Sequence, residues 1–155
     1  MVMPTYAEHV AAVIQNQHSE INKTMQRITM LLGHRPKPSL FGHRMSEIRL
    51  LLKLLEEQLA HHFHTEERHG TLKELRETMP RLAGIILKTE KDHPKLLEEL
   101  DSVGRLAVTL THPKPGELAN MERKFKTFLT HLSRHQGKED KILQGAYNSD
   151  IGVND

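Results

Sequence analysis

The sequence lacks cysteine and tryptophan and contains few other aromatic residues. Of its 155 residues, two are Tyr and four are Phe. Without thiolates, the chain cannot form disulfides, hold an iron–sulfur cluster through Cys or use a Cys nucleophile. The few aromatic rings and a net charge of +2 with mixed signs leave little for base stacking or phosphate tracking. We therefore expect no nucleic-acid partner.

Long apolar runs are also missing. No stretch approaches the roughly 18 apolar residues that suggest a membrane span. The residues from Met1 to Thr5 lack a charged region followed by an apolar one, as a secretion signal would have. The sequence therefore predicts a cytoplasmic protein with no membrane partner, and its length fits one domain that buries a core without disulfides.

Helix breakers divide the chain into four long amphipathic segments. They lie at residues 33–42, around Gly70 and Pro80, and at residues 113–116. Between them Leu, Glu, Lys, Met and Ala dominate, and the alternation typical of strands is missing. This pattern predicts an all-α fold, an up-down-up-down four-helix bundle.

The predicted bundle covers about residues 5–144 of a single domain spanning residues 1–155. Thr5 stands three residues before Glu8, the spacing of a capping box at the start of a helix. Residues 145–155 read as loop or disordered tail.

Each predicted helix carries an apolar stripe that advances in steps of three and four residues, and metal-ligand residues continue these stripes. A polar side chain in a bundle core costs several kcal/mol unless it is paired or ligated. A buried metal centre would explain why six such residues occupy apolar positions: His18, His62, Glu66, His93, His135 and Glu139. Most of the other histidines among the twelve fall off the stripes or near helix ends, as expected of solvated surface residues.

Helical rise places the four stripe histidines at one height. At about 1.5 Å per residue, His18 lies roughly 22 Å before the first loop and His62 roughly 28 Å after it. The same count gives about 27 Å for His93 and for His135 on either side of the last loop. In an antiparallel bundle the four imidazoles would therefore share one layer.

The two carboxylates belong to the same layer. Glu66 follows His62, and Glu139 follows His135, by four residues, so each pair projects from one helix face. Four imidazoles and two carboxylates exceed the needs of one tetrahedral zinc. They suit two iron or manganese ions with shared carboxylates and an open position for a small ligand.

Pro94 follows the third-helix histidine directly and predicts a kink beside His93, because a mid-helix proline removes a hydrogen bond. Glu90 precedes His93 by three residues, and it becomes a reserve ligand if the kink turns it inward. Ferritin-like di-iron bundles use that order on two helices. Here only one helix has it.

The motifs His18-Ser-Glu-Ile, His62-Phe-His-Thr-Glu66-Glu, Asp-His93 and His135-Gln-Gly-Lys-Glu139-Asp, between about Glu8 and Leu143, resemble those of the hemerythrin-like, or HHE cation-binding, family. The resemblance implies a four-helix bundle carrying a non-haem di-iron site, with two iron ions as cofactors and manganese or zinc as substitutes.

Two departures from the oxygen-carrying hemerythrins stand out. Those proteins have a further histidine one turn before the third-helix histidine, and Thr89 occupies that position here. They also use an aspartate five residues after the fourth-helix histidine, which would be Asp140, whereas Glu139 fits the stripe better; Asp140 is held in reserve. The resulting ligand set is similar to that of the di-iron domain of iron–sulfur-cluster repair proteins, without their cysteine-containing domain.

Three functions are compatible with these features. The first is a di-iron protein that binds or senses dioxygen, nitric oxide or a peroxide. The second is a di-iron enzyme of oxidative or nitrosative stress, which reduces peroxide or nitric oxide or donates iron for cluster repair. The third is a metal-free helical interaction protein with histidine-rich surfaces.

Overall fold

A computed structural model describes residues 5–68 and 71–153, and these are almost entirely helical, with no strand. The predicted all-α class is confirmed. The α-helices are α1 (Tyr6–Gly33), α2 (Phe41–Glu66), α3 (Leu72–Thr78), α4 (Ala83–Glu90), α5 (Asp92–Thr109) and α6 (Pro115–Val153), with 3₁₀ turns at Pro38–Leu40 and Pro80–Leu82. None of the described helices is long and apolar enough to cross a membrane.

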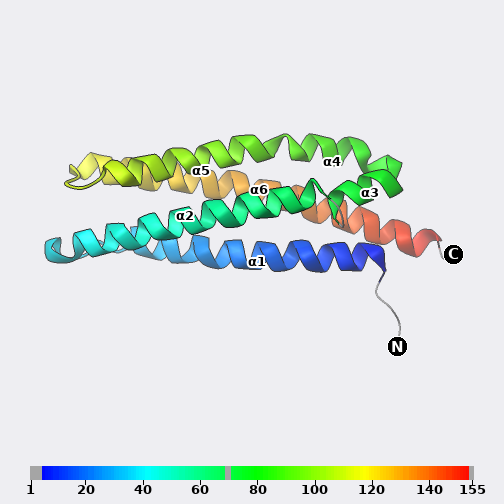
Figure 1. The fold of residues 1–155 in the computed structure, drawn as a ribbon, viewed down its shortest axis with the longest axis horizontal. Helices are drawn as coiled ribbons and strands as arrows, with labels where there is room; N and C mark the ends of the chain where they lie inside the picture. The colour runs from blue at the N-terminus through cyan, green and yellow to red at the C-terminus, as the bar shows by residue number, and fades with distance from the viewer. Residues whose placement is uncertain (1–4, 69–70, 154–155) are drawn as a thin grey trace, which may run out of the picture.

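The long helices α1, α2, α5 and α6 form the body of the molecule (Figure 1). Helix α1 packs against α2 and α6, and α5 packs against the same two helices, so that the order around the bundle is α1, α2, α5, α6. Consecutive long helices run in opposite directions, and Figure 1 shows the first and last described helical turns at the same end. Residues far apart in sequence can therefore meet at one level of the bundle.

The first helix begins where the sequence predicts. The Thr5 hydroxyl accepts a hydrogen bond from the Glu8 backbone N–H at 3.1 Å, and a Glu8 carboxylate oxygen accepts one from the Thr5 N–H at 2.7 Å. This reciprocal capping box satisfies two backbone donors that the helix itself leaves free.

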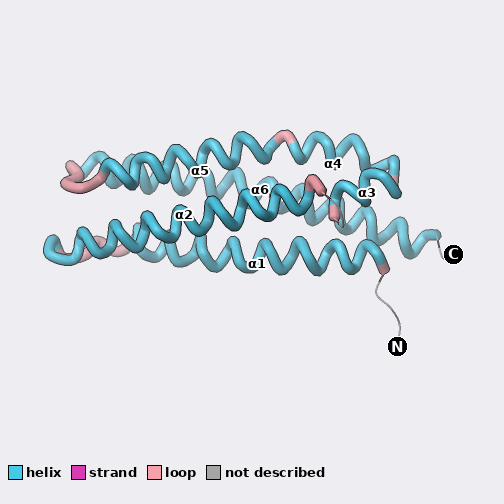
Figure 2. The backbone as a smooth tube through the Cα atoms, viewed as in Figure 1, coloured by secondary structure: helices cyan, strands magenta, loops and turns pink. Residues whose placement is uncertain are grey.

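The sequence predicts four helices, but the described residues form six α-helices. The third predicted segment is divided at Lys91, where α4 ends and α5 begins (Figure 2). Pro94 explains the break, since it has no N–H to bond the carbonyl of Glu90 and its ring would clash there. Pro94 itself lies in the first turn of α5, where proline is tolerated.

The short helix α3 occupies the connection that the breakers at Gly70 and Pro80 predicted; Gly70 lies outside the described residues. Leu72 and Leu75 of this helix are fully buried. Apolar side chains spaced by three residues thus make the connection a helix that covers the end of the bundle.

The apolar core has two parts. One runs along the four long helices and includes Ile21 and Leu132; the other includes Ile14 and Ile142 and receives the buried leucines of α3. On α1, His18 stands between the two parts, and on α6 Glu139 does the same. A polar layer therefore lies between two apolar ones.

The prediction of a loop or disordered tail over residues 145–155 is wrong as far as the structure describes it, because α6 continues to Val153. Ala146 is fully buried in the second apolar cluster. The Arg81 guanidinium donates a hydrogen bond to the Gly145 carbonyl at 3.1 Å. These contacts with the segment before α4, which sequence spacing does not reveal, keep the chain helical; residues 154–155 lie outside the described part.

Candidate metal centre

The six stripe residues come together in the polar layer. His18 comes from α1, His62 and Glu66 from α2, His93 from α5, and His135 and Glu139 from α6. All six are buried; His18 is 8% exposed, and the others are exposed by 2% or less. Their ligand atoms form two groups, each within 4.8 Å: His18, His62, Glu66 and Glu139, and Glu66, His93, His135 and Glu139. Both carboxylates belong to both groups.

Glu66 joins histidines of two different helices. One of its carboxylate oxygens, Oε1, contacts Nε2 of His62, and the other, Oε2, lies 3.1 Å from Nε2 of His93. The spacing of four residues between His62 and Glu66 permits the first contact, and the packing of α5 against α2 brings the second.

Glu139 has the same role on the opposite side. Its Oε1 lies 2.5 Å from Nε2 of His135, and its Oε2 lies 2.6 Å from Nε2 of His18 and 3.3 Å from Nε2 of His62. Each carboxylate thus extends from one group of imidazoles to the other.

Several of these atoms have no hydrogen-bond partner. They are both carboxylate oxygens of Glu66, Oε1 of Glu139, and Nε2 of His93 and His135. The atoms are close together, but their directions do not suit hydrogen bonds. A buried polar atom without a partner costs about 1–3 kcal/mol, and more when charged. Imidazole nitrogens and carboxylate oxygens that converge without hydrogen bonding fit metal ions at the centre of each group.

The electrostatics of the two carboxylates agree with this view. Burial and the neighbouring charge of Glu139 raise the pKa of Glu66 well above its ordinary value. Burial also acts to raise the pKa of Glu139, but the imidazoles of His135, His18 and His62 beside its carboxylate outweigh burial and hold the pKa well below the usual range. Glu139 is therefore stabilised as an anion, while Glu66 lacks enough positive charge nearby to stabilise its anionic form.

Three of the four histidines are held from behind by a side chain that sequence reasoning missed. Nδ1 of His62 lies 2.6 Å from Oε1 of Gln17, and Nδ1 of His93 lies 2.7 Å from a carboxylate oxygen of Glu67. Such contacts leave Nε2 directed into the centre and fix the ring orientation.

The third contact joins Nδ1 of His135 to Oδ2 of Asp92 at 3.1 Å, and the Lys138 ammonium donates to the same oxygen at 2.8 Å. Burial raises the pKa of Asp92, but hydrogen bonds from Lys138 and His135 outweigh it, so the net shift is downward. Gln17, Glu67 and Asp92 each adjoin a stripe residue in sequence, and that adjacency is the signal that could have found them.

Phe63 closes one side of the centre. Its ring stacks on His93 with 3.9 Å between centroids and an interplanar angle of 7°, and it meets the edge of His135 at 5.4 Å. Phe63 is 3% exposed. The ring also lies 5.7 Å from the His62 ring, but its closest contact is with His93, so it shields the His93 and His135 group most directly.

The reserve residues lie outside both groups. Asp140 is exposed on α6, directly after the buried Glu139. Glu90 is half-buried, and its carboxylate pairs with the Arg76 guanidinium at 3.5 Å. Thr89 is buried, but its hydroxyl donates to the Ile85 carbonyl at 2.8 Å and so serves its own helix.

The remaining histidines do not join the centre. His131 is partly exposed and contacts Glu99 at 2.6 Å. His69 lies outside the described residues, and the others are exposed: His9, His34, His43, His61, His64 and His112.

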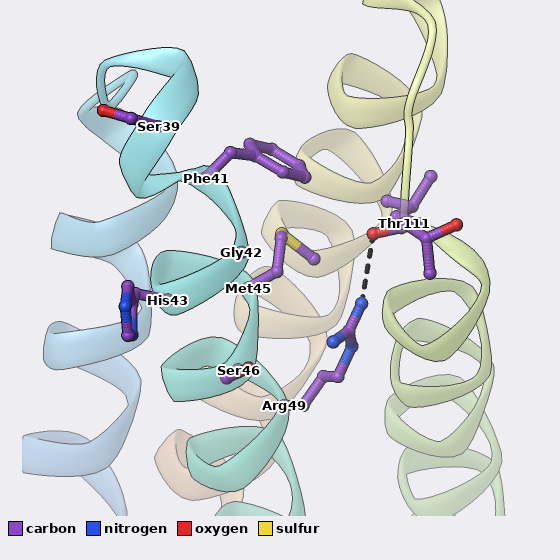
Figure 3. Close-up of a pocket in the computed structure, with 9 residues that line it drawn as sticks. Ser39, Phe41, Gly42, His43, Met45, Ser46, Arg49 and Thr111 are labelled. Atoms are coloured by element: carbon purple, nitrogen blue, oxygen red, sulfur yellow. Dashed lines mark hydrogen bonds between the residues drawn. The ribbon is translucent and has the colours of Figure 1, made fainter.

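A cavity of about 510 Å³ lies near the loops at one end of the bundle (Figure 3). The Arg49 guanidinium there donates to the carbonyls of Ala107 and Leu110, at 2.7 and 3.1 Å. These bonds satisfy carbonyls that the end of α5 leaves free, so Arg49 has a structural role.

Comparison with known families matches residues 9–147 to the hemerythrin HHE cation-binding domain. The chain belongs to this family. No curated protein and no solved structure matches the chain. For a member of the hemerythrin family, two buried groups of His and Glu indicate a metal-binding protein. Ligation by the six individual residues remains a prediction.

Proposed function

We propose that this hemerythrin-family chain is a non-haem di-iron protein that binds or senses dioxygen, nitric oxide or a peroxide at an open iron position. The observation that carries the proposal is the sharing of Glu66 and Glu139 between two buried histidine pairs. A pair of metal ions needs two sets of ligands joined by shared carboxylates, whereas a single ion needs only one set.

The donor set supports an open position. Each group offers two imidazoles and one oxygen from each of two carboxylates, four protein ligands in all. Octahedral ions such as iron or manganese would keep room for a small molecule. Bound iron supplies Lewis acidity and redox chemistry. The protein's own residues hold the ions, orient the imidazoles and exclude bulk water.

The surroundings favour a small ligand. Five of the six donors are exposed by 2% or less, and Phe63 covers one group, so a large organic substrate would have no contact surface at the ligand atoms. Thr89 takes the position of a histidine found in the oxygen carriers, which favours sensing or reaction over oxygen transport.

The experiment that tests the proposal adds nitric oxide, dioxygen or hydrogen peroxide to the iron-loaded protein and follows its absorption spectrum. Stoichiometric, reversible spectral change with any of them supports binding or sensing. Sustained consumption of nitric oxide or peroxide supports the alternative, a stress-response enzyme. An iron-loaded protein whose spectrum none of the three ligands changes would contradict both.

A further inference from the structure

Three side chains contact Nδ1 of a centre histidine and so support its ring, and these supporting residues follow one pattern around the bundle. Gln17 on α1 supports His62 on α2, Glu67 just after α2 supports His93 on α5, and Asp92 on α5 supports His135 on α6. Each supporting residue is the sequence neighbour of a metal-ligand residue on its own helix or helix end. Its side chain contacts the histidine of the next helix in the order α1, α2, α5, α6.

The pattern ends at His18, where α6 returns to α1. No described residue makes a hydrogen bond with Nδ1 of His18. Gln136, the residue after His135 on α6, donates instead to Oδ1 of Asn22 at 3.3 Å. His18 is also the most exposed of the six donors, at 8%.

The two histidine groups differ in the charge of their supporting side chains as well as in the number of those side chains. His93 and His135 each have a carboxylate behind the ring, although Lys138 offsets part of the Asp92 charge. A carboxylate partner increases the basicity of an imidazole and so its strength as a metal ligand.

The support of His62 is a neutral amide. The Thr65 hydroxyl donates to the His61 carbonyl at 2.9 Å and so can accept from the Gln17 amide nitrogen at 3.3 Å. This arrangement turns the Gln17 oxygen towards His62. The His18 and His62 group therefore has no carboxylate behind either imidazole.

We propose, on the basis of the di-iron function above, that the two metal positions are unequal. The His93–His135 position binds the first ion and holds it, while the His18–His62 position binds the second ion more weakly and exchanges it. Burial under Phe63 slows escape from the first position, and the partial exposure of His18 gives solvent and chelators access to the second. Gln17, Glu67 and Asp92 are positioning residues, because they act through the histidines.

The test is the release of ferrous iron from the anaerobically loaded full chain to an excess of a chromophoric chelator. We expect two phases of one equivalent each, with rates that differ by about 10-fold or more, the scale on which outer-shell partners alter metal affinity. The variant His18→Ala should lose the fast equivalent and keep the slow one.

Two substitutions should act on opposite phases. Gln17→Glu places a carboxylate behind His62 and should slow the fast phase, whereas Asp92→Asn removes one behind His135 and should accelerate the slow phase. Glu67→Gln provides the same test as Asp92→Asn if that variant does not fold. Asn22→Ala is the matched control, because it removes the acceptor of the hydrogen bond from Gln136 on α6 and Asn22 contacts none of the six metal-ligand residues. Neither phase should change.

The outcomes separate the two proposals. Release of both equivalents in a single phase, or equal effects of Gln17→Glu and Asp92→Asn on both phases, would overturn the inequality and leave the di-iron site standing. Uptake of less than one iron per chain would overturn both.

Discussion

Glu66 and Glu139 lie on different helices, are both fully buried, and hold carboxylate oxygens within 4.8 Å of one another. Two anions at this separation in a protein core repel each other and have lost their hydration. The four imidazoles around them can compensate only in part when neutral. Their arrangement is best explained by cations that bind between them, and its consequences can be measured.

Replacing Glu139 should reduce metal content far more than replacing its exposed neighbour. Glu139→Gln removes the charge of a carboxylate shared by both groups, so we expect the loss of at least one metal ion per chain. The measurement is elemental analysis of protein purified without chelator. Asp140→Asn is the control, since Asp140 is exposed and contacts neither group. Equal losses in the two variants would contradict the choice of Glu139 over Asp140.

The metal-free chain should show a pH dependence that comes from Glu66. Its pKa in the folded state is raised, by burial and then by Glu139, above the value of about 4.5 expected when unfolded. The folded state then binds more protons than the unfolded state, and the free energy of unfolding falls as pH rises above that value. The neighbouring His93 acts in the opposite direction but does not reverse the shift.

Glu66→Gln should remove this loss of stability. In metal-free protein, the melting temperature of the variant relative to wild type should therefore increase as the pH is raised from 4.5 towards 8. Thermal unfolding in the presence of a chelator measures the difference. A difference that stays constant over this range would show that Glu66 is not destabilised by its surroundings.

Phe63 should influence both stability and metal retention. Phe63→Ala removes a buried ring and should reduce the free energy of unfolding by about 3–5 kcal/mol in denaturant titrations. It should also accelerate metal release, because the ring shields His93. Phe125→Ala is matched in residue type and burial, and Phe125 lies in the core away from the donors. Similar acceleration by both variants would attribute the effect to general loosening.

The end of α6 should contribute to the fold. Deleting residues 145–155 removes buried Ala146 and the hydrogen bond from Arg81 to the Gly145 carbonyl. We expect a loss of about 1 kcal/mol or more in the free energy of unfolding, since one net hydrogen bond alone contributes about that much. Unchanged stability in denaturant titrations would show that these contacts do not stabilise the bundle.

The sequence predicted the parts of the structure that depend on helical periodicity. His18 and Glu139 were found because they continue apolar stripes, and helical rise placed the imidazoles in one layer. Pro94 indicated a disturbance beside His93, and the structure shows that disturbance as a break at Lys91, three residues before the proline. The supports Gln17, Glu67 and Asp92 depend on the rotation of neighbouring helices, which stripe positions alone do not specify.

The helix α3 and the extension of α6 were missed for a related reason. Glycine and proline mark where a helix is interrupted, but they do not show whether a short helix can form between them. Leu72 and Ala146 are helical and buried because distant segments cover them. Long-range packing of this kind leaves little trace in local spacing.

The most direct test of the account is an anaerobic titration of the metal-free protein with ferrous iron, followed by removal of unbound metal and elemental analysis. Two buried His and Glu groups that share Glu66 and Glu139 predict retention of two iron ions per chain, together with a higher melting temperature, because metal binds only the folded state. Retention of fewer than about one ion per chain, with no gain in thermal stability, would contradict the account.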